Sequence, residues 1–111
     1  MKVLSLFDGI SCGRLALERA NLPVEKYDAF EIDRYAIAVS QNNYPDIVQH
    51  GDVFNGNFKQ FKGYDLLLGG SPCTYWSVAK KERETTADGE GSRLFMEYVS
   101  CLLYTSDAAD E

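Results

Sequence analysis

The sequence alternates short apolar runs with amphipathic stretches, and this alternation constrains the fold more than any other feature. The apolar runs predict strands at residues 2–7, 27–32, 47–50 and 64–68. The amphipathic stretches predict helices at residues 13–20, at 34–43 and from 93 onward. Strands that alternate with helices form parallel sheets with right-handed crossovers. The chain is therefore predicted to be an α/β protein with a mostly parallel sheet, truncated after about four strands.

Four segments carry more specific expectations. Residues 36–39 are apolar and are predicted to be the buried side of the second helix. Residues 54–61 are predicted to be a polar connector with one helical turn. The run 64–68 is almost continuously apolar, as expected for a strand buried in a parallel sheet. Residues 79–91 are rich in charges and glycine and are predicted to form a mobile loop.

Candidate binding and catalytic residues follow the predicted strands at the points where the strands end. They are Asp8-Gly9, Glu31, Asp52-Val53, Gly69-Gly70 and Pro72-Cys73. Ligands of parallel sheets bind outside the carboxyl ends of the strands. These residues therefore predict a binding site along one edge of the sheet.

The first part of this site has the features expected for an adenosine ligand. The turn between Gly9 and Gly13 brings main-chain amides close to a ligand, although a plain tight turn explains it equally well. Glu31 lies about 20 residues further on, where an acid accepts hydrogen bonds from ribose hydroxyls. Asp52 is placed to accept the adenine amino group. Each acid taken alone is also consistent with an ordinary solvated side chain at a strand end.

S-adenosyl-L-methionine fits this turn better than NAD does. NAD requires closely spaced glycines around its diphosphate, and this turn has the spacing Gly-x-x-x-Gly with Asp8 beside it. A carboxylate repels a diphosphate but attracts the sulfonium and ammonium groups of S-adenosylmethionine. The sequence therefore favours S-adenosylmethionine as cofactor.

Cys73 is the candidate nucleophile. Pro72 fixes one backbone angle, and Gly69 and Gly70 permit an unusual path, which suits a side chain directed into a cleft. A thiolate is a good nucleophile once it is ionised. A lone cysteine is more often a small buried hydrophobic residue, so the alternative stays open on these residues alone. Cys12 is interpreted as structural.

Composition excludes several function classes. No apolar run approaches the roughly 20 residues that span a bilayer, and the first seven residues are too short for a signal peptide, so a cytoplasmic protein is expected. Three dispersed cysteines and one histidine, His50, predict neither a metal site nor a disulfide framework. The net charge of −6 is unfavourable for a nucleic-acid binder.

The last residues, 101–111, resemble the in-frame translation of a sequencing adapter. They include Cys101 and hold three acidic residues and no basic one, so the remainder carries −3. We therefore expect residues 1–100 to be the natural part of the chain and the complete protein to be much longer. At this length the chain is expected to be marginally stable and inactive alone, because half of the sheet would be missing.

Five motifs, in the same order, resemble those of the DNA (cytosine-5) methyltransferases. Their residues are most similar to those of the de novo branch and its phage and bacterial relatives. They are Val3-Leu4-Ser5-Leu6-Phe7-Asp8-Gly9-Ile10, Phe30-Glu31-Ile32-Asp33, Gly51-Asp52-Val53, Gly69-Gly70-Ser71-Pro72-Cys73 and Gly91-Ser92-Arg93-Leu94-Phe95. The resemblance covers residues 2 to about 100. It implies a Rossmann-like methyltransferase fold, with residues 1–100 as the amino-terminal part of the methyltransferase catalytic domain, and S-adenosylmethionine as cofactor. It also implies a bacterial or phage origin.

The resemblance also implies roles for individual residues. The cofactor would be bound by Phe7, Asp8, Gly9, Ile10, Glu31, Ile32, Asp52, Val53 and Gly70. Within this set, Glu31 holds the ribose, Ile32 packs on the adenine, and Asp52 and Val53 address the adenine edge. Cys73 would attack carbon 6 of a cytosine flipped out of double-stranded DNA, with Ser71 and Pro72 beside it.

The chain departs from the family pattern at two places. Thr74 stands where the family usually has Gln or Asn, and Ser11 and Cys12 replace glycine-rich residues. Lys80, Lys81 and Arg83 are interleaved with acids and are predicted to be weak phosphate contacts, although a solvated loop explains them as well. Tyr75 and Trp76 are expected either to stack near the flipped base or to pack under the loop.

Three alternatives remain open from the sequence. The same motifs occur in a branch of the family that methylates tRNA. A non-catalytic homologue that binds S-adenosylmethionine would keep the cofactor residues without the chemistry, and an NAD-binding module would share the sheet. The DNA recognition sequence, the oligomeric state and any partner restriction nuclease cannot be read from these residues.

Overall fold

The protein was analysed as a computed structural model, which describes residues 1–70, 93, 96 and 99–101. The elements follow one another as β1 (Lys2–Leu6), α1 (Cys12–Arg19), β2 (Lys26–Phe30), α2 (Arg34–Asn43), β3 (Val48–Gln49) and β4 (Leu66–Gly69), with two 3-10 turns, η1 (Val53–Asn55) and η2 (Phe58–Phe61), before β4. Residues 93, 96 and 99–101 are also helical, as expected for a helix that starts at Arg93.

The four strands form one parallel sheet in the order β3-β2-β1-β4, which confirms the predicted α/β class. β1 lies in the middle, and four of its five residues are buried. In its register Leu6 pairs with Phe30 on one side and with Gly69 on the other. The carboxyl ends of β1, β2 and β4 therefore lie level with one another. β3 is shorter than predicted, because only two of its residues pair with β2.

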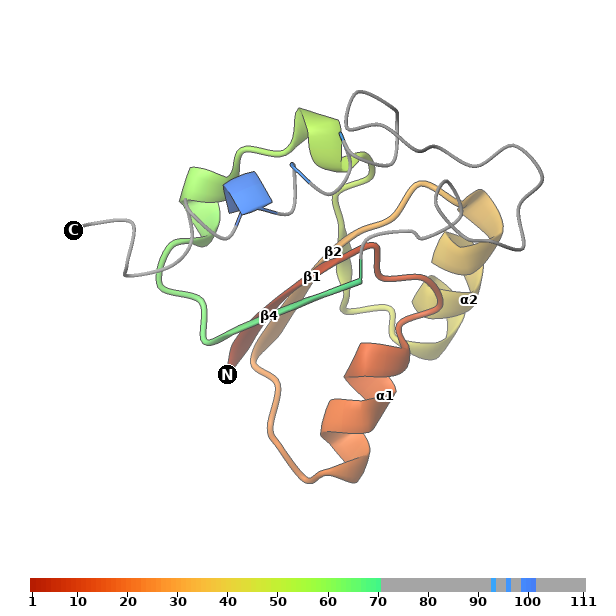
Figure 1. The fold of residues 1–111 in the computed structure, drawn as a ribbon. Coiled ribbons are helices and arrows are strands. Elements are labelled where there is room, and N and C mark those ends of the chain that lie inside the picture. The colour runs from red at the N-terminus through yellow and green to blue at the C-terminus, as the bar shows by residue number, and fades with distance from the viewer. Residues whose placement is uncertain (71–92, 94–95, 97–98, 102–111) are drawn as a thin grey trace, which may run out of the picture.

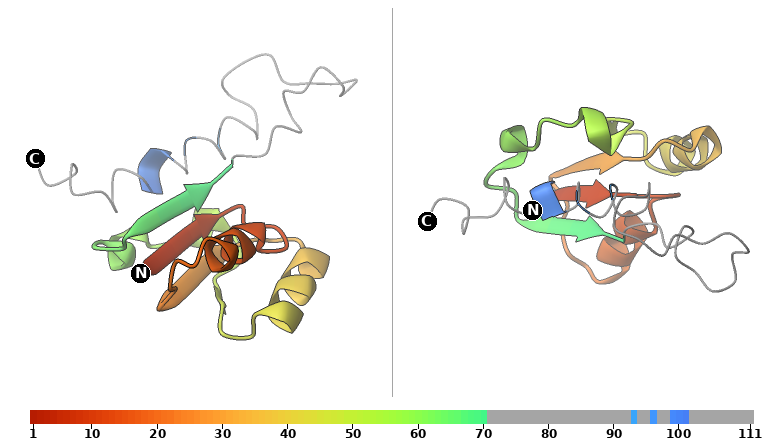
Figure 2. Two further views of the ribbon diagram at one scale, coloured as in Figure 1. Left: turned by 90° about the horizontal axis from the view of Figure 1, so that it is seen from below. Right: turned by 45° about the horizontal axis from the view of Figure 1, so that its top comes forward.

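Two crossover helices cover one face of the sheet, and the 3-10 turns cover the other (Figures 1 and 2). This follows from the strand order, because β1, β2 and β3 are laid down successively in one direction and right-handed crossovers then place both helices on the same face. The return from β3 to β4 passes β2 and β1 on the opposite face. Among the described residues no helix is long and apolar enough to cross a membrane.

The core between the sheet and the helices is small. It consists of Val3, Leu17, Tyr27, Ala29 and Ile47. The predicted buried side of α2 is only partly correct, because Ala38 and Val39 are exposed and the one fully buried residue of this helix is Ser40. Successive helical residues are turned by about 100°, so four consecutive side chains cannot all face the sheet.

The second core lies on the opposite face and is richer in aromatic side chains. It consists of Leu4, Leu6, Phe30, Val53, Phe58, Phe61 and Cys101. The segment 54–61 was predicted to be polar, but Phe58 and Phe61 are buried and anchor it to the sheet. The assignment of residues 101–111 to a non-native tail stays a prediction. Cys101, the first residue of that segment, is fully buried in this core.

Candidate functional site

The predicted site residues up to Gly70 lie along one edge of the sheet. Phe7 follows β1, Glu31 follows β2, and Gly70 follows β4, whose ends are level in the strand register. The end of β3 is tied to the same edge, because the His50 amide donates to the Ala29 carbonyl at 2.8 Å. The sheet therefore collects the described members of the predicted site.

The segment 7–11, which we call the 7–11 loop, leaves β1 with an unusual backbone. Phe7, Gly9 and Ser11 have φ values of 55°, 64° and 70°, in the left-handed region. This conformation costs a residue with a side chain roughly 1–2 kcal/mol, so it persists only when neighbouring contacts enforce it. Two such contacts are main-chain bonds, from the Asp8 amide to Phe30 and from the Ser11 amide to Asp8.

The Asp8 carboxylate supplies three more contacts to this loop. It accepts hydrogen bonds from the hydroxyls of Ser5 at 2.7 Å, of Tyr27 at 2.6 Å and of Ser11. Burial raises the pKa of Tyr27 well above its usual value, and the bond to Asp8 raises it further. The carboxylate is thus turned toward the protein interior and holds the loop. Its predicted attraction for a cationic cofactor stays a prediction.

Glu31 joins the end of β2 to the same loop. One carboxylate oxygen accepts the Gly9 amide at 2.8 Å, and the other accepts the amides of Ile32 and Asp33, each at 2.9 Å. Ile32 projects outward with 73% of its surface exposed, and Ile10 is also exposed. An acid beside two exposed aliphatic side chains suits a ligand with hydroxyl groups and a flat apolar ring.

The end of β3 presents Asp52 but not the side chain of Val53. The Asp52 carboxylate accepts the Phe54 amide at 2.9 Å and thereby caps η1. Val53 is 4% exposed and packs in the second core. A contact between Val53 and an adenine edge would therefore come from its main chain.

The remaining predicted site residues lie at the end of the described segment 1–70 or beyond it. Gly70 is exposed, and a methyl group added at its Cα would meet no atom of the described residues within 4 Å. The other predicted site residues, namely Ser71, Pro72, Cys73, Lys80, Lys81 and Arg83, lie outside the described residues, as do Tyr75, Trp76 and the predicted loop at 79–91. In the described ranges no group of three or more His, Cys, Asp or Glu residues is arranged to hold a metal ion.

A buried polar cluster, on the face of the sheet that the 3-10 turns cover, was not predicted. Asp28 is 1% exposed, and its carboxylate is bonded to His50 Nε2 at 2.7 Å and to the Tyr64 hydroxyl. The His50 ring stacks on Phe30, and the Lys26 ammonium lies 3.8 Å from the carboxylate. The signal in the sequence was Asp28 itself, a charged residue at the centre of an apolar strand. Its partners could not be identified, because they are 22 and 36 residues away.

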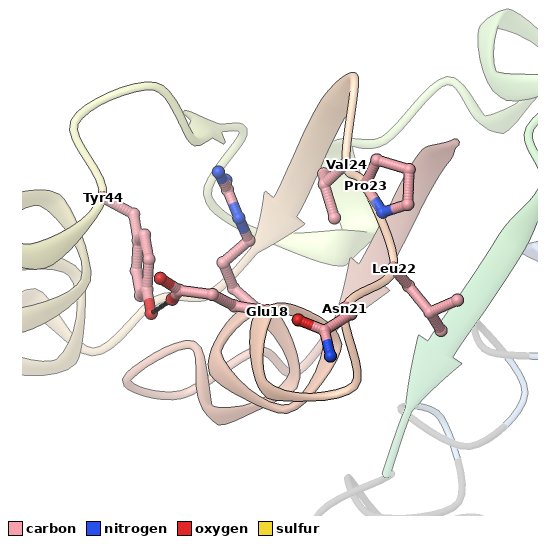
Figure 3. Close-up of a pocket in the computed structure, with 7 residues that line it drawn as sticks. Glu18, Asn21, Leu22, Pro23, Val24 and Tyr44 are labelled. Carbon is pink, nitrogen blue, oxygen red and sulfur yellow. Dashed lines mark hydrogen bonds between the residues drawn. The ribbon is translucent and has the colours of Figure 1, made fainter.

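The structure also has a surface pocket of about 530 Å³ at the far end of α1 (Figure 3). It is lined by Arg14, Glu18, Asn21, Leu22, Pro23, Val24 and Tyr44. In it the Tyr44 hydroxyl donates to Glu18 at 2.7 Å. Residues 21–24 precede β2, so this pocket lies at the amino ends of the strands, away from the 7–11 loop. It contains none of the predicted site residues.

A model of the C-5 cytosine-specific DNA methylase family matches residues 1–106. Among curated proteins, the chain is 36% identical over 104 residues to the orphan methyltransferase M.SPRI of Bacillus phage SPR, covering 92% of this chain and 23% of that protein. It is 29% identical to the DNA (cytosine-5)-methyltransferase DRM2 of Arabidopsis thaliana, covering 92% of this chain and 18% of the relative. The chain thus spans about a fifth of the length of these relatives.

The fold is that of known methyltransferases. The crystal structure of S. pombe Dnmt2 methyltransferase matches with a TM-score of 0.67 and 19% identity, over 96% of this chain and 30% of that one. The structure of Spodoptera frugiperda DNMT2 matches with a TM-score of 0.61 and 22% identity, over 91% of this chain and 31% of that one. At these identities the likeness concerns the fold alone.

Proposed function

The chain belongs to the C-5 cytosine-specific DNA methylase family, and on that premise we propose that it forms the cofactor- and nucleophile-bearing part of an enzyme that methylates carbon 5 of cytosine in double-stranded DNA. The observation that carries the proposal is the shared sheet edge. There the 7–11 loop, Glu31 and Asp52 follow three parallel strands, and in the sequence the Pro72-Cys73 motif begins three residues after the end of the fourth.

The residues at this edge fit S-adenosylmethionine. Glu31 offers carboxylate oxygens for ribose hydroxyls, the exposed Ile32 offers an apolar surface for adenine, and Asp52 offers an acceptor for the adenine amino group. The 7–11 loop brings main-chain atoms of Phe7, Gly9 and Ile10 to the same edge, and Gly70 leaves open space beside it. When bound there, this cofactor supplies the methyl group.

Cys73 provides the covalent chemistry in this proposal. Its thiolate adds to carbon 6 of a cytosine that has left the base stack, which makes carbon 5 a nucleophile. After carbon 5 has been methylated, loss of the proton from carbon 5 and of the thiolate from carbon 6 restores the ring. The protein contributes the covalent bond and the positioning of the two reactants. Ser71 and Pro72 lie beside the base, and Lys80, Lys81 and Arg83 contact DNA phosphates.

The test uses the complete protein that contains this chain. Methyl groups labelled in S-adenosylmethionine should appear in double-stranded DNA, and Cys73→Ser should abolish the transfer while the protein still binds S-adenosylhomocysteine. Cys12→Ser is the matched control, because Cys12 is exposed on α1 and should tolerate the change. Full activity of the Cys73→Ser protein would refute the nucleophile assignment. Transfer to tRNA but not to DNA would move the enzyme to the tRNA-methylating branch.

A further inference from the structure

A chain of buried and partly buried hydrogen bonds leads from the sheet to the 7–11 loop. Gln49 Nε2 lies 3.1 Å from the Ser40 hydroxyl oxygen, and the Ser40 oxygen lies 2.5 Å from that of Ser11. Ser11 in turn donates to the Asp8 carboxylate. We call these four residues the Gln49–Asp8 relay. They come from β3, α2, the cap of α1 and the loop itself.

The Asp8 carboxylate at the end of this relay fixes the direction of every hydrogen bond in it. An ionised carboxylate only accepts, so the single hydroxyl proton of Ser11 must point at Asp8. Ser40 must then donate to Ser11, and Gln49 must donate its amide N–H to Ser40. This agrees with the Gln49 carbonyl oxygen, which is buried and has no hydrogen-bond partner within the part of the chain that the structure describes. Each hydroxyl donates one bond and accepts one, and no other orientation lets all three bonds form with an ionised Asp8.

The relay acts on Ser11, one of the left-handed residues of the loop. Ser11 has a φ of 70° and caps α1, and its side chain is not bonded to that helix. Its hydroxyl instead joins Asp8 to Ser40, both of which lie outside α1. Ser40 is completely buried, and Ser11 is 1% exposed, so water cannot replace a missing partner without rearrangement. The loop is therefore held in place from α2, a helix that lies 29 residues further along the chain.

We propose that Ser40 and Tyr27 are positioning residues for cofactor binding, which act through the Asp8 carboxylate on the 7–11 loop and do not touch the cofactor. This assignment rests on the proposed function, because it takes the loop to be part of the cofactor site. Tyr27 and Ser5 bond one oxygen of Asp8, and the relay bonds the other, so the relay and Tyr27 are two of its supports. Loss of either support lets the loop relax from its left-handed conformation.

The experiment removes one hydroxyl at a time from the complete protein. Ser40→Ala removes both bonds that tie Ser11 to α2 and β3, and it keeps α2 stable because alanine is the better helix former. Tyr27→Phe keeps the ring in the core and deletes the other support. Tyr64→Phe is the matched control, because it also removes a hydroxyl from a buried carboxylate, that of Asp28, on the opposite face of the sheet.

The readout is the dissociation constant for S-adenosylhomocysteine by calorimetry, together with steady-state kinetics. Both test variants should bind about tenfold more weakly, the factor that corresponds to one buried hydrogen bond. The KM for S-adenosylmethionine should rise by a similar factor, while the KM for DNA and kcat at saturating cofactor stay near native values. The control should keep native cofactor affinity.

Two results would overturn the positioning role of Ser40 and Tyr27 and leave the proposed function standing. One is native affinity in both folded test variants, and the other is an equal loss in Tyr64→Phe, which would indicate general destabilisation. If Ser40→Ala fails to fold, Tyr27→Phe still decides, because the phenyl ring fills the same space. A native protein that binds no S-adenosylhomocysteine would overturn the proposed function and this assignment with it.

Discussion

Replacing Glu31 by glutamine removes the charge that joins the end of β2 to the 7–11 loop. The carboxylate accepts three main-chain amides, one from Gly9 and two from Ile32 and Asp33. A glutamine side chain has only one oxygen. That oxygen is best used for the two neighbouring amides, so the amide nitrogen of glutamine then faces the Gly9 N–H, and two donors meet.

The cost can be worked out from these contacts. A hydrogen bond to a charged group contributes roughly 1.5–3 kcal/mol when it is protected from water. The Gly9 bond is only partly buried, so about 1–2 kcal/mol is a fair value for its loss. Weaker acceptance of the ribose hydroxyls adds about 1 kcal/mol. The sum of about 2–3 kcal/mol predicts a roughly 30- to 150-fold rise in the dissociation constant for S-adenosylhomocysteine.

Calorimetry on the complete protein measures this directly, and Asp33→Asn is the control. Asp33 loses the same charge two residues away, but its carboxylate caps α2 through the amides of Tyr35 and Ala36. Both capping bonds go to one oxygen of Asp33, which the amide oxygen of asparagine can replace, so we expect the control to keep nearly all of its stability and its cofactor affinity. Tight binding by Glu31→Gln, or an equal loss in Asp33→Asn, would refute the reasoning.

Two further predictions concern stability. A methyl group at Gly13 would lie 2.8 Å from Leu68 Cδ1 and 3.1 Å from the Tyr27 hydroxyl. Gly13→Ala should therefore lower the free energy of unfolding, measured in urea, by about 1–3 kcal/mol. Gly70→Ala, where the methyl group would meet no described atom within 4 Å, should be nearly neutral. Burial raises the pKa of both Tyr27 and Tyr64, helped by their bonds to carboxylates. A raised folded-state pKa means that stability is complete below the ordinary tyrosine value near 10 and falls as the pH rises beyond it. Alkaline unfolding should therefore be less steep in Tyr27→Phe; an unchanged slope would contradict this.

Much of the fold was predictable because it depends on local patterns. Apolar runs alternating with helical stretches predicted every described strand and helix to within a few residues, since burial sets the period of each element. The same alternation fixed which strand ends meet, so the positions of Glu31 and Asp52 at one edge followed from topology alone. Membership of the family, which the motifs implied, is confirmed by the match over residues 1–106.

The direction of side chains was not predictable in the same way. The attraction of Asp8 for a cationic cofactor stays a prediction, but no local pattern indicated that its carboxylate also accepts bonds from hydroxyls on β1, β2 and the cap of α1. Phe58 and Phe61 looked like members of a polar segment because lysine and glutamine separate them, yet a 3-10 turn puts both against the sheet. Such features depend on partners that are distant in the sequence, and no local pattern specifies those partners.

The backbone of the 7–11 loop has a consequence for the kinetics of ligand binding. Three of its five residues are left-handed, a combination that a disordered peptide seldom visits. Folding sets this shape before a ligand arrives, so the ordering entropy of these residues is not subtracted from the affinity. The rate of association with a preformed surface is set by diffusion and orientation. Differences in affinity then arise mainly from the rate at which the complex dissociates.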